Sequence, residues 1–168
     1  MTKNVLMMIG LPACGKTTIR DSFVDGNVVY ISSDDMLESI ARNLGKTYDD
    51  VFQDNIKDVE SKMWSFFDAA LADDGVDTIV IDRTNLSPKS RARFLQKCKG
   101  CNVEAFVFHP PRGPAELEEW NRRLESRKGK TIPRNILDSM FRSFKFPTKE
   151  EGFSRIHSYN SFTGDYRG

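Results

Sequence analysis

Cysteine is scarce in this 168-residue chain, and no apolar run approaches the roughly 20 residues that a membrane-spanning helix needs. The three cysteines are too few for a disulfide scaffold and suit a reducing compartment. The first residues also lack the long apolar stretch of a secretory signal. We therefore expect a cytoplasmic protein with no membrane segment, and the length fits one domain that covers residues 1–168.

Net charge is also small, at +1, but its distribution is uneven. The charged residues in 34–77 are mostly acidic and those in 83–145 are mostly basic. The basic part could face a polyanion or could be a solvated helix face. Cys98 and Cys101 form a single CxxC, which would leave zinc short of ligands. Packing at a helix end is the preferred interpretation of this pair.

Four β-rich apolar stretches, at 5–9, 28–31, 78–81 and 103–108, are each followed by a segment of helical period. This alternation predicts an α/β fold with a parallel sheet of four to five strands flanked by helices. The tail at 153–162 alternates weakly and is compatible with an additional edge strand.

Helical signals lie between these stretches. Ser87 and Pro88 are typical of a helix start, and further helices are expected around 117–124 and from Pro133 onward. A helical stripe of apolar residues predicts a core-facing helix that Gly75 can close. The stripe comprises Phe52, Ile56, Val59, Met63, Phe66, Phe67 and Ala70.

Residues 10–17, GLPACGKT, fit the phosphate-loop pattern GxxxxGK[ST] between the first strand and a helix expected to run through Phe23. Glycines let consecutive main-chain N–H groups curl around phosphates, and a helix N-terminus adds partial positive charge. The residues expected to bind the nucleotide are Gly10, Pro12, Ala13, Cys14, Gly15, Lys16, Thr17 and Thr18.

The loop indicates ATP and Mg²⁺ as cofactors. Lys16 is expected to reach the β- and γ-phosphates, and the Thr17 hydroxyl is expected to bind Mg²⁺. Cys14 could be an oxidant-sensitive thiolate in this loop, although a small packing residue is the preferred interpretation.

Polar side chains follow the second and third strands, at the edge where open α/β sheets bind ligands. Asp34 is the predicted general base for an acceptor hydroxyl, with Asp35 beside it, and the alternative is that Asp34 only caps a helix. Asp82 could hold Mg²⁺ through water. The acceptor or phosphates could be contacted by Arg83, Thr84 and Asn85, unless these residues only form a turn before Ser87.

Basic residues cluster around Gly129 and predict a cationic lid at about residues 121–134. Arg123 and Arg127 are four residues apart, so on a continuing helix they would share a face and neutralise charge on the transferring phosphoryl group. A solvated basic turn is the alternative. The remaining members of the cluster are Arg122, Lys128 and Lys130.

Four segments in order, GLPACGKTT, ISSDDM, IDRTNLSP and NRRLESRKGKTIPRNILDSMFRSF, resemble the kinase domain of phage-type polynucleotide kinases, within the small P-loop kinases. The resemblance implies a P-loop kinase fold and a nucleic-acid 5′-hydroxyl as acceptor. It also implies that Asp34 is the base, that Lys16 and Thr17 bind phosphate and metal, and that Arg123 and Arg127 grip the phosphates.

The chain departs from that family on the acceptor side. Ser33 and Leu37 stand where the phage enzymes have arginines, although Arg83, Arg91 or Arg93 could substitute for them. The open alternatives are a hydroxymethyl-pyrimidine base in DNA, a nucleoside or a small metabolite as acceptor. A nucleotide switch is disfavoured because the guanine-reading NKxD motif is absent, and a DxDG phosphatase motif is also lacking.

Overall fold

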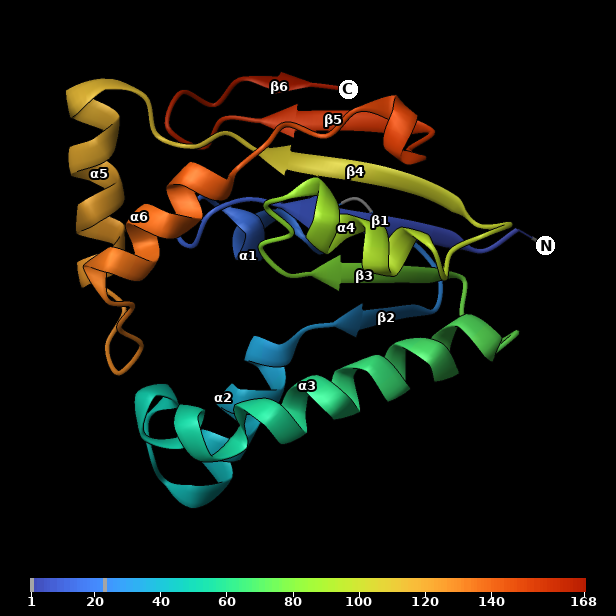
Figure 1. Cartoon of the computed structure of the whole chain (residues 1–168), viewed down its shortest axis with the longest axis horizontal. Helices are drawn as coiled ribbons and strands as arrows, with labels where there is room; N and C mark the ends of the chain where they lie inside the picture. The colour runs from blue at the N-terminus through green and yellow to red at the C-terminus, as the bar shows by residue number, and fades with distance from the viewer. Residues whose placement is uncertain (1, 23) are drawn as a thin grey trace.

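A six-stranded sheet in the order β2-β3-β1-β4-β5-β6 forms the centre of the computed structural model, which describes residues 2–22 and 24–168 (Figure 1). All neighbouring strands are parallel except β5 and β6. This confirms the α/β class with one strand more than the upper expected number. The strands are β1 (Asn4–Ile9), β2 (Val28–Ile31), β3 (Thr78–Asp82), β4 (Asn102–Phe108), β5 (Arg155–Tyr159) and β6 (Tyr166–Arg167).

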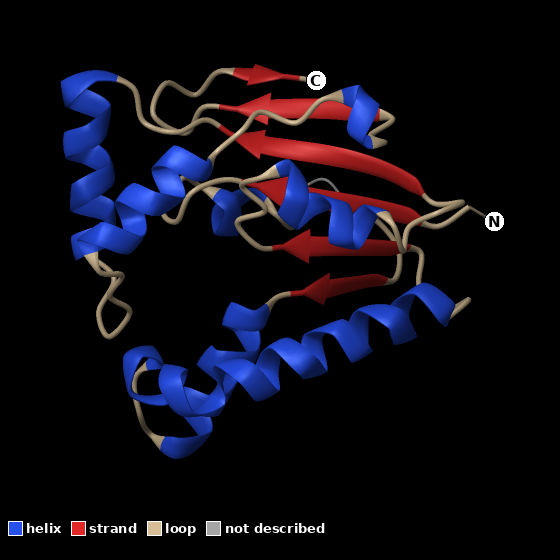
Figure 2. Ribbon diagram, in the orientation of Figure 1, coloured by secondary structure: helices blue, strands red, loops and turns tan. Residues whose placement is uncertain are grey.

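Helices surround this sheet (Figure 2). Among the residues that the structure describes, none of the helices has the length and apolar character to span a membrane. They are α1 (Lys16–Ile19), α2 (Ser33–Leu44), α3 (Tyr48–Ala72), α4 (Pro88–Leu95), α5 (Gly113–Glu125) and α6 (Arg134–Ser143), with a short 3-10 turn η1 (Lys149–Glu151).

The predicted helix signals are confirmed, except that α3 ends at Ala72 with an extended Asp73 as its C-cap and is not closed by Gly75. Ser87 caps α4 as part of a capping box, and the stripe on α3 is buried or half-buried except for Phe66, which is 46% exposed. Consecutive helical residues point about 100° apart, so Phe66 and the fully buried Phe67 cannot both face the core. The tail strand β5 is an inner strand, because β6 pairs with its far side.

The helix after the phosphate loop is shorter than predicted. α1 ends at Ile19, where a tight turn begins with the Ser22 N–H donating to the Ile19 carbonyl at 2.8 Å. The β-branched residues of α1 and the Asp21-Ser22 pair after it are weak helix formers. The predicted end of this helix, Phe23, lies outside the described residues.

Arg91 is a fully buried charge that organises the turn between β3 and α4. Its Nε and Nη2 donate to the two carboxylate oxygens of Glu151 at 2.8 and 3.2 Å. Its Nη1 donates to the carbonyl oxygens of Asn85, Leu86 and Lys145 at 2.9 to 3.1 Å. This corrects the expectation that Arg91 could contact an acceptor, because all of its charge is used inside the fold.

We expect Glu151→Gln to lower the free energy of unfolding by about 3 kcal/mol, because it leaves the buried Arg91 charge without its carboxylate. Asp68→Asn is the matched control, since it breaks an exposed pair with Lys97 and should change stability by less than about 1 kcal/mol. Urea denaturation at pH 7 measures both. Equal losses in the two variants would contradict a structural role for the buried pair.

Acid should reduce the difference between wild type and Glu151→Gln. Burial opposes ionisation, but the hydrogen bonds from Arg91 and the Thr148 amide hold the pKa of Glu151 below its ordinary value. A depressed folded-state pKa gives stability that is present above the unfolded value of about 4.3 and is lost as pH falls through the folded value. Urea titrations between pH 7 and pH 3 measure this loss.

Candidate active site

The phosphate loop follows β1 at the carboxyl edge of the sheet and is shaped by two glycines (Figure 1). A Cβ on Gly10 would lie 2.9 Å from the Phe108 Cβ, and Gly15 has a φ of 102°, which side chains rarely adopt. Lys16 Nζ donates to the carbonyl oxygens of Gly10 and Leu11 at 2.7 and 2.8 Å. Desolvation of this ammonium lowers the pKa of Lys16 to about 8. A cation is therefore held at the centre of a curled backbone.

With only four residues, α1 contributes a weak dipole, so the loop amides and Lys16 provide most of the positive field for a phosphate. Thr17 and Thr18 are exposed at the start of α1. Cys14 is fully buried, and burial raises the pKa of its thiol to about 11. A neutral packing thiol follows, in agreement with the preferred interpretation of this residue.

The other two cysteines are also packing residues. Burial raises the pKa of the Cys98 thiol to about 12, and Cys98 and Cys101 are both free thiols. The Cys98 side chain packs in the core cluster beneath α3 and α4.

The outer side of the loop is held by α5. The Trp120 indole Nε1 donates to the Pro12 carbonyl at 2.8 Å, and Trp120 is 2% exposed. Arg123 Nη1 donates to the Ala13 carbonyl at 3.3 Å and to the Ser161 hydroxyl at 2.8 Å. The predicted lid residue Arg123 therefore lies directly against the phosphate loop.

Arg20, which lies in no recognisable sequence motif, joins two of the predicted site carboxylates. Its Nη1 donates to Asp82 at 2.8 Å and to Asp35 at 2.9 Å. Burial acts to lower the pKa of Arg20, but these two carboxylates raise it above its already high ordinary value. Both predicted residues thus lie at the carboxyl edge, and both share one guanidinium.

A magnesium ion fits the donor set of this edge. Thr17 offers an exposed hydroxyl after the loop, and Asp82 offers a carboxylate at the end of β3. Within residues 2–22 and 24–168 no group of three or more His, Cys, Asp or Glu side chains could form an all-protein cage. Mg²⁺ is commonly held by one or two protein oxygens together with substrate phosphates, so a cage is unnecessary.

Asp34 is free of a capping role, because the Ser32 hydroxyl caps α2 by accepting from the Asp35 amide at 3.1 Å. The Tyr48 hydroxyl donates to Asp34 Oδ1 at 2.7 Å, and Lys130 Nζ donates to Oδ2 at 3.2 Å. Burial acts in the opposite direction, but Lys130 and the Tyr48 hydrogen bond hold the pKa of Asp34 below its ordinary value. An ionised carboxylate is therefore fixed at the start of α2, 54% exposed.

Arg127 lies beyond the end of α5, so it does not share a continuing helix with Arg123 as the spacing predicted. Its Nη1 is buried and has no hydrogen-bond partner among the described residues. Arg127 and Lys130 line a cavity of about 200 Å³ between α5 and α6. A buried guanidinium nitrogen of this kind costs free energy unless it meets an acceptor, and a phosphate oxygen is a suitable one.

The remaining predicted acceptor residues are held by other parts of the fold. Arg83 pairs with Glu60 at 2.8 Å, and the Thr84 carbonyl accepts from the Gly10 amide at 2.9 Å. Asn85 is 4% exposed and donates to the Met8 carbonyl at 2.8 Å, so it supports the strand that leads into the phosphate loop. Of these three residues, only Arg83 presents a side-chain charge near the acceptor side.

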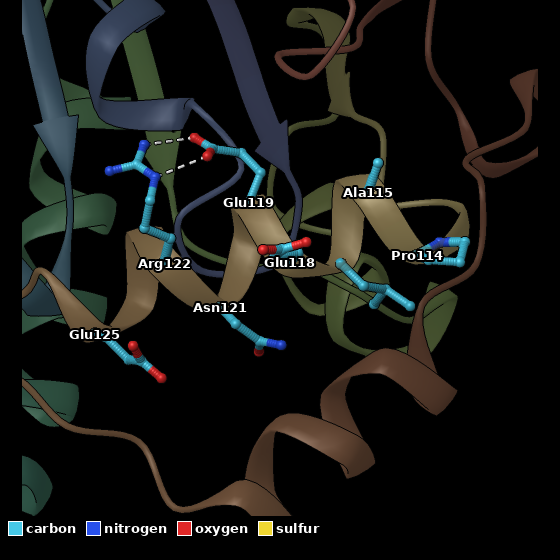
Figure 3. Close-up of a pocket in the computed structure, with 8 residues that line it drawn as sticks. Pro114, Ala115, Glu118, Glu119, Asn121, Arg122 and Glu125 are labelled. Carbon is cyan, nitrogen blue, oxygen red and sulfur yellow. Dashed lines mark hydrogen bonds and ion pairs between the residues drawn. The ribbon is translucent and has the colours of Figure 1, made fainter.

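A larger groove, of about 660 Å³, runs along α5 (Figure 3). It is lined by residues of this one helix, from Pro114 to Glu125, and Arg122 donates to Glu119 on the same helix. The groove includes none of the phosphate-loop residues. We therefore place the candidate active site at the carboxyl edge of the sheet.

The strand order, the loop after β1 and the helices at the carboxyl edge define a P-loop kinase fold. The chain belongs to the AAA domain family, whose family model matches residues 5–147. Membership implies nucleotide binding in the loop at 10–17. No curated protein sequence matches the chain.

Several solved structures share this fold. A fungal RNA kinase is 14% identical, with a TM-score of 0.55, and the match covers 95% of this chain and 75% of that one. A sugar kinase from Janibacter sp. HTCC2649 is 22% identical, with a TM-score of 0.54 and coverage of 95% and 86%. A chain of the Pnkp1/Rnl/Hen1 RNA repair complex is 17% identical, with a TM-score of 0.61 and coverage of 84% and 44%. At these identities the likeness shows the fold alone.

Proposed function

We propose that the protein is an ATP- and Mg²⁺-dependent kinase that transfers the γ-phosphoryl group to a hydroxyl of a nucleic acid, the 5′-hydroxyl end of DNA or RNA. The observation that carries the proposal is Asp34, an ionised carboxylate that does not cap the helix and lies at the same sheet edge as the phosphate loop. A switch protein needs the loop but has no use for a carboxylate held ready on the acceptor side.

On the donor side, the loop amides and Lys16 would bind the phosphates of ATP. Phosphate oxygens would replace the Gly10 and Leu11 carbonyls as acceptors of the Lys16 hydrogen bonds. Thr17 and Asp82 would hold Mg²⁺, which when bound neutralises charge on the phosphate oxygens. Arg123 against the loop and Arg127 with its buried nitrogen would close on the transferring group.

On the acceptor side, Asp34 would accept the hydrogen bond of the attacking hydroxyl and take its proton as the new P–O bond forms. The hydroxyl oxygen attacks the γ-phosphorus, the bond to the β-phosphate oxygen breaks, and ADP leaves. Lys130 Nζ donates to Asp34 Oδ2 in this structure, and the acceptor hydroxyl would replace Lys130 as the donor to that oxygen.

The nucleic-acid acceptor is supported by the resemblance of the lid segment to polynucleotide kinases and by the exposed cations Lys128 and Arg134 within the lid. A second candidate, an uncharged small hydroxyl compound, is favoured by the charges around Asp34. Asp35, Glu38 and Glu60 lie on that side, and the arginine positions of the phage enzymes are the buried Ser33 and Leu37. These carboxylates pair with Arg20, Lys130 and Arg83, so this side offers no excess positive charge to a phosphate backbone.

A transfer assay with labelled γ-phosphate of ATP separates these acceptors. We expect label on a single-stranded oligonucleotide with a 5′-hydroxyl and none on the same oligonucleotide with a 5′-phosphate. Equal labelling of both would indicate that the acceptor is another hydroxyl, such as the hydroxymethyl group of a modified base. Labelling of nucleosides or sugars alone would contradict a nucleic-acid acceptor and support the second candidate.

A further inference from the structure

Tyr48, the first residue of α3, connects the predicted base to the lid. Its hydroxyl donates to Asp34 Oδ1 at 2.7 Å, and Lys130 Nζ lies 4.6 Å from the centre of its ring. Lys130 also pairs with Glu38, one turn after Asp34 on α2. One aromatic side chain therefore contacts both the carboxylate and the cation that covers it.

The turn that carries Tyr48 is fastened on both sides. The Thr47 hydroxyl caps α3 within a capping box, which fixes the first helical residues. The lid packs on the same turn, because both carboxylate oxygens of Asp49 accept from the Thr131 amide at 2.9 and 3.0 Å. The Asp49 amide donates to the Gly129 carbonyl at 2.9 Å, and a Cβ on Gly129 would lie 2.8 Å from the Thr47 Cβ.

We propose that Tyr48 is a positioning residue for phosphoryl transfer, whose hydroxyl fixes Asp34 Oδ1 so that Oδ2 alone is presented to the acceptor. The inference rests on the proposed function, in which Asp34 is the base. A carboxylate held at one oxygen cannot rotate away from the attacking hydroxyl, whereas a carboxylate that is free to turn spends less time in the reactive orientation.

The titratable groups that face Asp34 come from four parts of the fold. Lys130 and Arg127 come from the lid, Lys16 from the phosphate loop, Glu38 from α2, and Tyr48 from α3. Burial and the neighbouring Asp34 carboxylate raise the pKa of Tyr48, so its hydroxyl stays a hydrogen-bond donor throughout the working pH range. The hydrogen bond that Tyr48 supplies to the charged form of Asp34 lowers the pKa of that carboxyl.

Tyr48→Phe tests the proposal because it removes the hydroxyl and keeps the ring that Lys130 contacts. We expect kcat to fall about tenfold, as for loss of a hydrogen bond to a charged group, with the KM for ATP unchanged. Loss of the bond raises the pKa of Asp34, so the acidic limb of the kcat/KM profile should move to higher pH. A carbon-13 titration of the Asp34 carboxyl should move in the same direction.

Tyr166→Phe is the matched control, since it removes a tyrosine hydroxyl that binds His157 at the opposite edge of the sheet. Its kcat and pH profile should equal those of wild type. Wild-type kcat, pH profile and carboxyl titration in Tyr48→Phe, together with an inactive Asp34→Asn, would overturn the positioning role and leave the kinase proposal standing. Full turnover by Asp34→Asn would overturn the positioning role and the assignment of Asp34 as the base.

Discussion

Replacement of Arg127 by alanine is expected to lower kcat by about 10³-fold, the lower limit of the effect of arginines that stabilise a transferring phosphoryl group. The buried Nη1 of Arg127 has no acceptor among the described residues, so it can donate a hydrogen bond to a bound ligand without breaking one within the protein. Because the negative charge to be neutralised is greatest during transfer, kcat should change more than the KM for ATP. Single-turnover transfer of labelled γ-phosphate measures the effect.

Arg122→Ala is the matched control for this variant. Arg122 also lies in the lid, but its side chain is 69% exposed and pairs with Glu119 on the surface of α5. We expect its turnover to stay within about twofold of wild type, since exposed pairs contribute little. Near-normal turnover by Arg127→Ala would remove Arg127 from the catalytic residues and leave the lid as a solvated basic turn.

Asp34→Asn should lower kcat by roughly 10²- to 10⁴-fold, the range for loss of general base catalysis. Asparagine keeps the size of the side chain and a carbonyl oxygen that can accept from Tyr48, but it cannot take a proton. ATP affinity should be retained because Asp34 lies on the acceptor side, and isothermal titration together with single-turnover kinetics separates binding from transfer.

Asp58→Asn provides the comparison for charge alone. Asp58 lies on α3, is 67% exposed and pairs with Lys62 on the same helix. Its loss removes one negative charge from the same helical hairpin without touching Asp34, so turnover should be unchanged. If Asp34→Asn turned over at the wild-type rate, the proton would have to leave through another group and the acceptor side would need to be reassigned.

Segments whose structure depends on local pattern could be predicted from the sequence. The apolar stretches became β1 to β4 because buried parallel strands are apolar on both faces, and Ser87 before Pro88 became a capped helix start. The phosphate loop was readable because its glycines and Lys16 act through backbone geometry. β6 was missed because two residues carry no readable alternation.

Side chains that meet from distant elements could not be predicted. Arg20 bridges Asp35 and Asp82 across separations of 15 and 62 residues, and nothing in its local pattern distinguishes it from a surface arginine. Tyr48 follows a helix cap, where an aromatic residue is usually assigned to packing. Asn85 and Arg91 were expected near the acceptor because their chemistry suits one, but the direction of their side chains, into the fold, is set by tertiary packing.

The hydrogen bond from Trp120 to Pro12 has a consequence for motion at the site. Because Trp120 and Arg123 tie α5 to the loop that would hold ATP, the base of the lid cannot swing away without disturbing that loop. Any opening of the lid would therefore hinge after Ser126, and the segment that moves would be the short span up to Pro133. Release of a phosphorylated product and exchange of the nucleotide would then take place at different parts of the site, and the product could leave without disturbing the phosphate loop.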